Sequence, residues 1–273
     1  MMRNKISILG CGWLGMPLGI ELVKLGFEVS GSTTDADKLL EIEENGMSPF
    51  FVSLTPSLNS NVDKAFFNAD ILIVNIPPKR RDDIISFHYE QIKSLVDEIN
   101  KSTIKKVLFV SSTSVYPNTN GVVDENTNLE PQKNSGIALR SVEDLLLSQS
   151  FFETTIIRFG GLIGYDRLPG RFLAGKKNLK NGDSPVNLIH RDDCIGLLLT
   201  VIKEDFWGKL INGIMPEHPS RREFYTKASE MSHLPIPEFD NLREEQEYKI
   251  ISSIVVGNDL SYDFKYTSPL LVL

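Results

Sequence analysis

The chain has 273 residues, of which 41% are hydrophobic and 24% charged, and 29 Lys and Arg against 36 Asp and Glu give a formal net charge of -7. This composition is that of an ordinary globular protein, and at about 100 to 200 residues per domain the length allows one large domain or two modest ones. An acidic chain without a polybasic run argues against nucleic acid or an anionic membrane as its main partner, so we expect small molecules or proteins instead.

Cysteine usage and hydropathy bear on the cellular compartment, on membrane contact and on metal binding. Cys11 and Cys194 lie far apart, with no second cysteine or histidine at a metal-binding spacing, so the sequence predicts neither a disulfide framework nor a zinc site. No stretch of about 18 uninterrupted apolar residues occurs, and the apolar patch near the N-terminus is broken at once by Gly10 and Gly12. We therefore expect a cytoplasmic protein with no membrane contact and no bound metal.

Short apolar runs alternate with helical patterns over residues 1–160, which indicates parallel βαβ units. Strands are expected at residues 6–9, 27–32, 50–54, 71–76, 106–110 and 154–158, and helices at 14–25, 34–45, 82–100 and 137–147. The run 71–76 is apolar on both faces, as a strand in the middle of a parallel sheet must be.

The pattern changes after the fifth expected strand. Residues 112–136 form a long polar loop, and loops of this length inside a compact domain are more often functional than incidental. Beyond Gly164 the chain becomes irregular and rich in Gly and Pro. We predict a doubly wound α/β fold of the Rossmann type, in which residues 1–164, rejoined by about 188–215, form a dinucleotide-binding domain. Residues 165–187 and 216–273 are expected to form a small α+β substrate lobe.

A complete glycine-rich fingerprint follows the first expected strand. Gly10, Gly12 and Gly15 form GxGxxG directly before a helix, the context in which this motif binds a dinucleotide. The first glycine allows a tight turn, the second lets the backbone approach a diphosphate, and the third permits close packing of helix on strand. The helix N-terminus offers free N–H groups to the anion. The expected cofactor contacts are Gly10, Cys11, Gly12, Trp13, Leu14 and Gly15, with Cys11 a small loop residue rather than a nucleophile.

The end of the second expected strand bears on the choice of cofactor. NAD-binding chains place an acidic residue there for the ribose diol, whereas this strand ends in Ser32 and Thr33, and Asp35 follows slightly late. The two hydroxyls together with Lys38 can receive a 2'-phosphate, which favours NADP over NAD. The alternative is that Lys38 is a solvated helix residue.

Four motifs in order carry a family resemblance. After the glycine loop come Ser111 to Tyr116 (SSTSVY), Arg158 to Gly164 (RFGGLIG) and Val186 to Asp193 (VNLIHRDD). With them the chain resembles the extended short-chain dehydrogenase/reductases, and more narrowly their atypical NAD-dependent epimerase/dehydratase branch, over nearly its whole length. The resemblance implies a homodimer formed through the helices at 84–99 and 137–147. The remaining expected cofactor contacts are Ile76, Pro77, Ser111 and Gly161.

The resemblance also implies which residues do the chemistry. In that family the hydroxyl four residues before the motif tyrosine orients the reacting oxygen, which is Ser112 here, with Tyr116 as a weaker catalytic candidate. The alternative for Ser112 is a serine that serves the loop backbone. The family's YxxxK acid/base pair is absent, because Ser135 and Leu139 stand at the positions of the tyrosine and the lysine.

Three functions therefore remain open. The first is an NAD(P)-dependent oxidoreductase or epimerase/dehydratase-like enzyme acting on a sugar nucleotide or similar anionic metabolite, with Tyr165 and His190 as further candidate proton carriers. The second is a catalytically silent NAD(P)-binding sensor or interaction protein, and the third is a purely structural role. Positive charge near the expected cleft suits an anionic substrate. The predicted substrate contacts are Thr113, Asn187, Arg171, Lys176 and Lys79.

Overall fold

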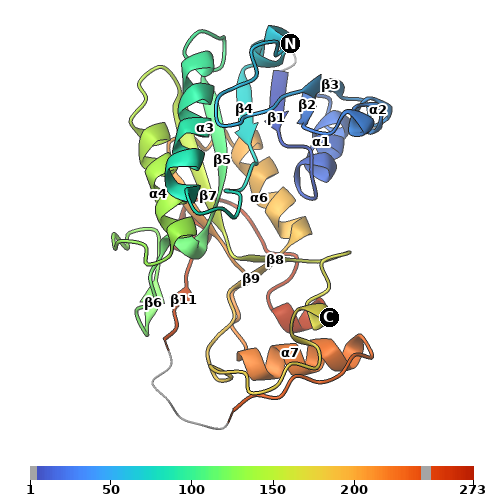
Figure 1. Ribbon diagram of the computed structural model, residues 1–273, viewed down its shortest axis with the longest axis vertical. Coiled ribbons are helices and arrows are strands. Elements are labelled where there is room, and N and C mark those ends of the chain that lie inside the picture. Colours follow the sequence, from blue (N-terminus) through green and yellow to red (C-terminus); the bar gives the residue numbers. More distant parts are fainter. Residues whose placement is uncertain (1–4, 241–246) are drawn as a thin grey trace.

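Seven parallel strands form the central sheet of the computed structural model, which describes residues 5–240 and 247–273 (Figure 1). The strands are β1 (Lys5–Leu9), β2 (Glu28–Thr33), β3 (Ser48–Phe51), β4 (Ile71–Val74), β5 (Lys106–Ser112), β7 (Glu153–Phe159) and β10 (Leu210–Gly213). Their order is β10-β7-β5-β4-β1-β2-β3, so the winding direction reverses at β1 and β4. Such a reversal opens a crevice at the carboxyl ends of the strands, where α/β proteins bind ligands.

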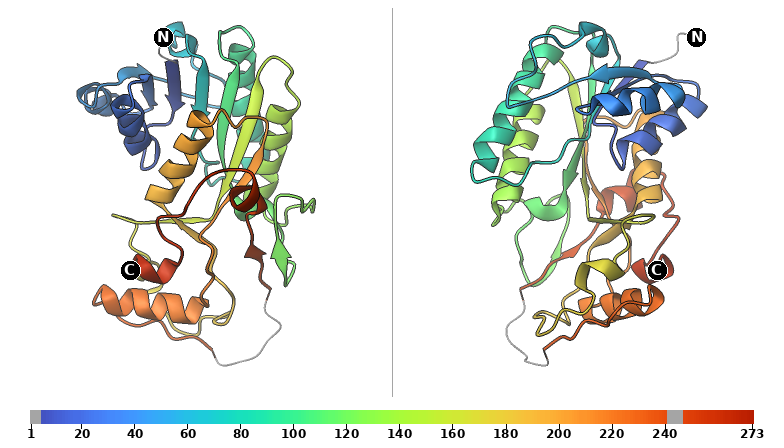
Figure 2. Two further views of the ribbon diagram at one scale, coloured as in Figure 1. Left: turned by 180° about the vertical axis from the view of Figure 1, so that it is seen from behind. Right: turned by 45° about the vertical axis from the view of Figure 1, so that its right-hand side comes forward.

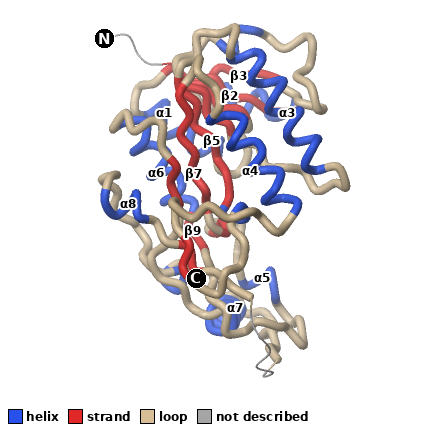
Figure 3. The backbone as a smooth tube through the Cα atoms, turned by 90° about the vertical axis from the view of Figure 1, so that its left-hand side faces the viewer, coloured by secondary structure: helices blue, strands red, loops and turns tan. Residues whose placement is uncertain are grey.

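Helices cover both faces of this sheet, as a doubly wound fold requires (Figure 3). On one face lie α1 (Gly15–Lys24) and α6 (Arg191–Lys203), whose leucines pack in one apolar core with β1. On the other face α3 (Ile84–Ile99) and α4 (Asn134–Leu147) lie side by side over a second core with β5. The short α2 (Leu39–Glu44) follows β2 and packs beside β3. The predicted Rossmann-type fold class is confirmed, and α3 and α4 form the face proposed for a homodimer.

A smaller lobe lies below the carboxyl ends of the strands in Figure 1. It is joined to the sheet domain through a two-stranded parallel sheet of β8 (Gly161–Ile163) and β9 (Leu188–His190). The helices α5 (Gly170–Leu173) and α7 (Arg221–Met231) pack on each other beyond it. A small core around Ile163, Met215 and Phe224 holds the lobe together. Segments 165–187 and 216–240 thus lie largely in this lobe.

The chain after residue 247 crosses back to the sheet domain before it ends on the lobe (Figure 2). The strand β11 (Ile250–Ile251) pairs with β6 (Val122–Val123) of the long loop after β5, and α8 (Ile254–Asn258) packs on β10. The buried carboxylate of Asp193 then accepts hydrogen bonds from the Tyr262 hydroxyl and the Lys265 backbone N–H, both at 2.7 Å. Residues 250–264, which the sequence assigned to the lobe, therefore pack on the sheet domain. Residues 1–4 and 241–246 of the predicted domains lie outside the described residues.

The described residues also form four short 3₁₀ helices, two of which lie next to the site. They are η1 (Ala36–Lys38), η2 (Lys64–Phe67), η3 (Thr113–Val115) and η4 (Pro269–Leu271). Asp35 caps η1 by accepting a hydrogen bond from the Asp37 backbone N–H at 3.1 Å. The hydroxyl of Ser112 caps η3 in the same way, so a 3₁₀ turn begins directly at the carboxyl end of β5.

His88 is a fully buried histidine on α3, held in one tautomer by its neighbours. Gln91 donates its amide N–H to the carbonyl of Leu54 at 2.7 Å, so the amide oxygen of Gln91 accepts from Nδ1 of His88 at 3.2 Å. The Nε2 atom of His88 has no partner among the described residues. Burial lowers the pKa of His88 below 6.5, although the hydrogen bond to Gln91 opposes this.

The free energy of unfolding should therefore fall as the pH is lowered into the mildly acidic range. The unfolded chain binds a proton at His88 more readily than the folded chain does, so the contribution of neutral His88 is present above a pH of about 6.5 and is lost as the pH falls toward the lowered pKa. Denaturant titrations at several pH values between about 5 and 7 should show a shallower fall for His88→Leu than for the parent. The exposed His233→Asn is the control. A slope identical in parent and His88→Leu would contradict the assignment.

Candidate functional site

The glycine loop between β1 and α1 has three glycines in three different environments. Gly10 has a left-handed φ of 104°, which permits the turn, and its carbonyl accepts a hydrogen bond from the Asn75 amide at 3.1 Å. A Cβ added at Gly15 would lie 2.1 Å from the carbonyl oxygen of Gly10, so this residue must be small for α1 to approach β1. A Cβ added at Gly12 would meet nothing within 4 Å. The backbone at Gly12 therefore faces open space at the N-terminus of a ten-residue helix, the arrangement that receives a diphosphate.

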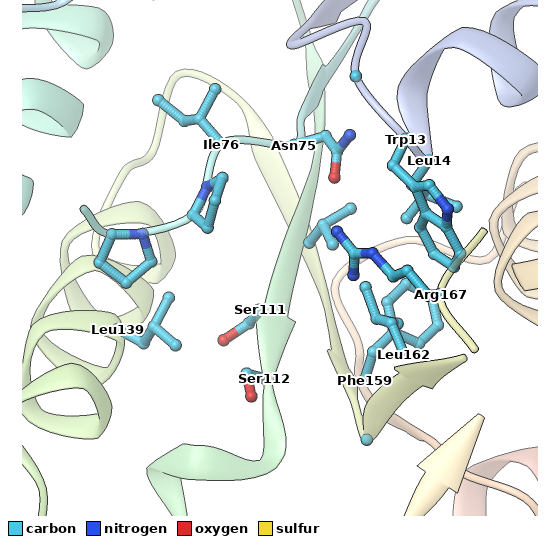
Figure 4. A pocket seen from close by; sticks show the side chains of 15 residues that line it. Trp13, Leu14, Asn75, Ile76, Ser111, Ser112, Leu139, Phe159, Leu162 and Arg167 are labelled. Carbon is cyan, nitrogen blue, oxygen red and sulfur yellow. The ribbon is translucent and has the colours of Figure 1, made fainter. Parts of the chain in front are cut away.

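Two adjoining cavities extend from this loop along the carboxyl edge of the sheet. One, of about 390 Å³, lies beside β5, and the other, of about 520 Å³, lies beside β2. They share Gly12, Asn75, Ile76 and Pro77, so they form one elongated groove across the glycine loop. Figure 4 shows the part beside β5. A dinucleotide fits a groove of this kind, with its diphosphate at the glycine loop and one nucleoside in each cavity.

The cavity beside β2 is where this fold places the adenosine half. The hydroxyl of Ser32 accepts from the Gly10 backbone N–H at 3.1 Å, and the hydroxyl of Thr33 accepts from the Asp35 backbone N–H at 3.1 Å. Both hydroxyls thus also serve the loop backbone, while Lys38 is exposed at the rim. Lys79, predicted to touch substrate, lines this cavity and not the one beside β5.

Cys11 also lines the cavity beside β2, but its thiol is buried under the loop. Burial raises its pKa to about 12, against a smaller opposing effect of the hydrogen bond to the Ser32 backbone. A thiol that keeps its proton at neutral pH is a poor nucleophile.

Two adjacent serines at the end of β5 present opposite hydrogen-bonding roles to the other cavity. Ser111 donates its hydroxyl proton to the buried Glu143 carboxylate at 2.6 Å, which leaves only acceptor capacity on its oxygen. The Ser112 oxygen accepts from the Ser114 backbone N–H at 3.2 Å, which leaves its own proton to be donated. Both line the cavity (Figure 4). Ser112 is therefore the hydroxyl that can donate to a substrate oxygen.

Leu139 and Ser135, which the family resemblance puts at the lysine and tyrosine positions of YxxxK, occupy different surroundings. Leu139 is buried and forms an apolar wall of the cavity beside β5, opposite the two serines in Figure 4. Ser135 lies one turn earlier on α4 and is not among the residues that line either cavity. Leucine supplies no charge to hold a ribose or to lower the pKa of a neighbouring acid.

Tyr116, the weaker catalytic candidate of the sequence, is packed in the core. Its ring is 2% exposed, and its hydroxyl donates to the Asn212 side chain at 3.0 Å. Burial raises the pKa of its phenol, although the nearby Arg158 opposes this. The position of Tyr116 in the motif identified the loop, but the packing of that loop turns the hydroxyl toward β10.

Three predicted lobe contacts are engaged elsewhere or lie outside the groove. The Asn187 amide donates to the Lys249 carbonyl at 2.9 Å and accepts from the Ile251 backbone N–H at 2.8 Å, so both of its ends hold the returning C-terminal segment. Arg171 and Lys176 are not among the residues that line the two cavities.

The other predicted residues near the strand ends are structural supports. Thr113 is buried in η3, where its carbonyl accepts from the Lys249 ammonium at 2.9 Å. Gly161 donates its backbone N–H to the Asn187 carbonyl at 2.8 Å, and its neighbour Gly160 lines the cavity instead. Nδ1 of His190 accepts from the Asp192 backbone N–H at 3.2 Å, which caps α6.

Sequence reasoning missed several residues of this site. Lys249, desolvated by burial and facing the like charge of Lys133, has a pKa lowered to about 8 and holds the carbonyls of η3. Glu143 and Arg158 form a buried ion pair behind the serines, with the two side chains 1% and 3% exposed. No local signal marked that pair, because α4 also carries Arg140 and Asp144 and β7 also carries Glu153. Arg167, in contrast, is one of the basic residues that the sequence places near the expected cleft, and it lines the cavity beside β5.

The described part of the chain lacks a membrane-spanning helix and a cluster of metal ligands. None of its helices combines the length and the apolar character that a bilayer crossing demands. Within residues 5–240 and 247–273, no three His, Cys, Asp or Glu side chains gather closely enough to hold a metal ion.

Known proteins resemble the chain in both sequence and fold. Residues 10–205 match the family described as NAD(P)H-binding. The protein YeeZ of Escherichia coli K12 is 34% identical over 271 residues, which cover 98% of each chain. A UDP-glucuronic acid 4-epimerase from Bacillus cereus, solved with NAD, matches with a TM-score of 0.80 at 19% identity over 98% of this chain and 94% of its own.

A UDP-Glc/GlcNAc 4-epimerase from Campylobacter jejuni matches with a TM-score of 0.79 at 17% identity, over 98% of this chain and 96% of its own. Identities this low establish a shared fold and leave the reaction open. The match to the family model extends from the glycine loop through α6, so it includes both cavities and the two serines. The chain therefore belongs to the NAD(P)H-binding family and has the Rossmann-type fold of the short-chain dehydrogenase/reductases and NAD-dependent epimerases.

Proposed function

We propose that the protein is an NADP(H)-dependent oxidoreductase or epimerase-type enzyme that acts on an anionic metabolite such as a sugar nucleotide. The observation that carries this proposal is the continuous groove, which passes from Lys38 over the open backbone of Gly12 to the free hydroxyl proton of Ser112. When bound, a nicotinamide cofactor supplies or accepts a hydride. Structural neighbours named for UDP-sugar epimerases support the substrate class.

The role of Ser112 in this proposal is to orient and polarise a substrate oxygen. Its hydroxyl is fixed by the Ser114 N–H and keeps one proton to donate into the cavity. The proton carrier that such a reaction needs is not among the residues that line the cavity beside β5, because Arg167 is their only ionisable side chain. The proton would then be exchanged with a group of the substrate itself, or with a water molecule through the Ser112 hydroxyl.

This lack of an acid/base group favours a second candidate, a sensor that binds NADP(H) without turnover. Leu139, which the family resemblance puts at the position of the lysine, makes this wall apolar, so a nicotinamide can be held there without a group to exchange protons. The two candidates share the same groove and differ only in turnover.

Turnover and the Ser112→Ala variant separate the two candidates. For the enzyme, NADPH consumption with a panel of anionic carbonyl compounds and oxidised UDP-sugars is expected, and Ser112→Ala should lower kcat by about a hundredfold or more while the Kd for NADPH is unchanged. Ser135→Ala, which removes a hydroxyl outside both cavities, is the matched control. Tight NADPH binding without turnover on the whole panel would replace the enzyme by the sensor.

The preference for NADPH is a separate prediction. The Lys38 ammonium at the rim of the cavity beside β2 can pair with a 2'-phosphate, so calorimetric titration should give a lower Kd for NADPH than for NADH. Lys38→Ala should remove most of that difference, by roughly tenfold, and leave NADH binding nearly unchanged. A parent protein that prefers NADH, with Asp35 serving the ribose diol, would overturn the prediction.

A further inference from the structure

Arg167 brings a positive charge from the lobe to the glycine loop. Among the described residues that line the cavity beside β5, it alone carries a charge. Figure 4 shows its side chain extending into the cavity beside Trp13. Its guanidinium carbon lies 4.1 Å from the centroid of the Trp13 ring, so the cation is stacked on a residue of the glycine loop itself.

The turn that carries Arg167 is tied down at several points. Gly164 and Tyr165 adopt left-handed φ values of 115° and 56°, and backbone hydrogen bonds join Gly164 and Arg167 in both directions at 3.3 and 3.1 Å. The neighbouring Asp166 accepts a hydrogen bond from the Trp13 indole N–H at 2.6 Å. The lobe is thus attached to the glycine loop through Trp13, and the guanidinium has a defined position at the rim of the groove.

A second arginine approaches the same indole from α6. The guanidinium of Arg191 lies 5.1 Å from the Trp13 ring centroid and donates to the Trp13 carbonyl at 3.4 Å. Neither Arg191 nor Arg167 forms an ion pair with a carboxylate in the described part of the chain. Two arginines and one carboxylate, Asp166, therefore meet at this indole, which leaves a net positive charge that an anion at the glycine loop would relieve.

We propose that Arg167 binds the diphosphate of the dinucleotide from the lobe side, opposite the backbone N–H groups at the start of α1. The diphosphate would then be held between the two domains. A planar guanidinium suits this role because it presents parallel N–H donors to phosphate oxygens. The inference rests on a dinucleotide occupying the groove and on neither the reaction nor the substrate of the proposed function.

Calorimetry with cofactor fragments tests this assignment. ADP-ribose carries the diphosphate without the nicotinamide, whereas adenosine 2'-monophosphate carries neither phosphate of the diphosphate. Arg167→Gln should weaken ADP-ribose binding by roughly tenfold to a hundredfold and reduce its salt dependence, with adenosine 2'-monophosphate binding unchanged. Arg167→Lys keeps the charge without the planar stack, so its affinity for ADP-ribose should lie between those of the parent and of Arg167→Gln. Arg171→Gln, an exposed arginine of the same lobe outside the groove, should behave like the parent.

Each other outcome is decisive. If Arg167→Gln binds ADP-ribose as the parent does, the arginine serves another anion, such as that of the substrate, and the proposal is overturned. Equal weakening of both fragments would also overturn it, because the effect would then be a general change of charge or fold. A parent protein that binds neither fragment would contradict the cofactor site itself.

Discussion

Gly12→Ala should raise the Kd for NADPH by about a hundredfold or more while leaving the folded state intact. The added methyl group points into open space, with no atom within 4 Å, so nothing in the protein opposes it. It would occupy the space through which the diphosphate approaches the backbone, and the short N–H contacts at the helix N-terminus would be lost. Calorimetric titration and the Tm of the unliganded protein measure the two effects independently.

Gly15→Ala is the matched control, three residues on in the same motif. Its Cβ would lie 2.1 Å from the Gly10 carbonyl oxygen and 3.0 Å from the Asn75 amide nitrogen, so α1 must move. We expect a lowered Tm for Gly15→Ala and an unchanged Tm for Gly12→Ala. Normal NADPH affinity in Gly12→Ala would show that the diphosphate does not lie at this loop.

Arg158→Met should lower the free energy of unfolding by about 3 to 5 kcal/mol. The guanidinium of Arg158 on β7 is 3% exposed, and its Nε donates to the Glu143 carboxylate at 3.0 Å. Without it, the Glu143 carboxylate on α4 would remain buried with only the Ser111 hydroxyl as a hydrogen-bond donor. Urea denaturation followed by circular dichroism measures the loss.

Two comparisons isolate the buried charge as the cause. Glu143→Leu combined with Arg158→Met removes both charges and should recover much of the lost stability, because no unpaired ion remains. Lys24→Met breaks an exposed pair with Glu21, whose side chains are 65% and 43% exposed, and should cost less than about 1 kcal/mol. A loss in Arg158→Met no larger than in Lys24→Met would contradict the role assigned to the pair.

The buried pair also bears on the site, since Glu143 orients the Ser111 hydroxyl. A carboxylate that accepts the Ser111 proton fixes which of the two serines at the end of β5 accepts and which donates. The ion pair thus stabilises the junction of α4, β5 and β7 and sets the hydrogen-bonding pattern of the cavity wall. Neither Glu143 nor Arg158 is among the residues that line the cavity beside β5, and the wall next to the serines is formed by the apolar Leu139.

Local signals in the sequence determined the fold class and the place of the groove. The strand expected at 71–76 is apolar on both faces and lies as β4 between β1 and β5, because a strand covered by helices on both sides has no solvent face to keep polar. The glycine loop could be located in advance for a similar reason. A tight turn, an open backbone and a close helix contact are all properties of six consecutive residues.

Only the tertiary structure decided which distant side chains face that groove. Lys79 lines the cavity beside β2, and Tyr116 is buried in the core. The Asn187 side chain is hydrogen-bonded to the returning segment at Lys249 and Ile251. Arg167, more than 150 residues from Trp13, reaches the glycine loop because β8 and β9 dock the lobe there. Periodicity and turn chemistry report on neighbours along the chain, whereas these contacts depend on how two domains and a returning C-terminal segment pack together.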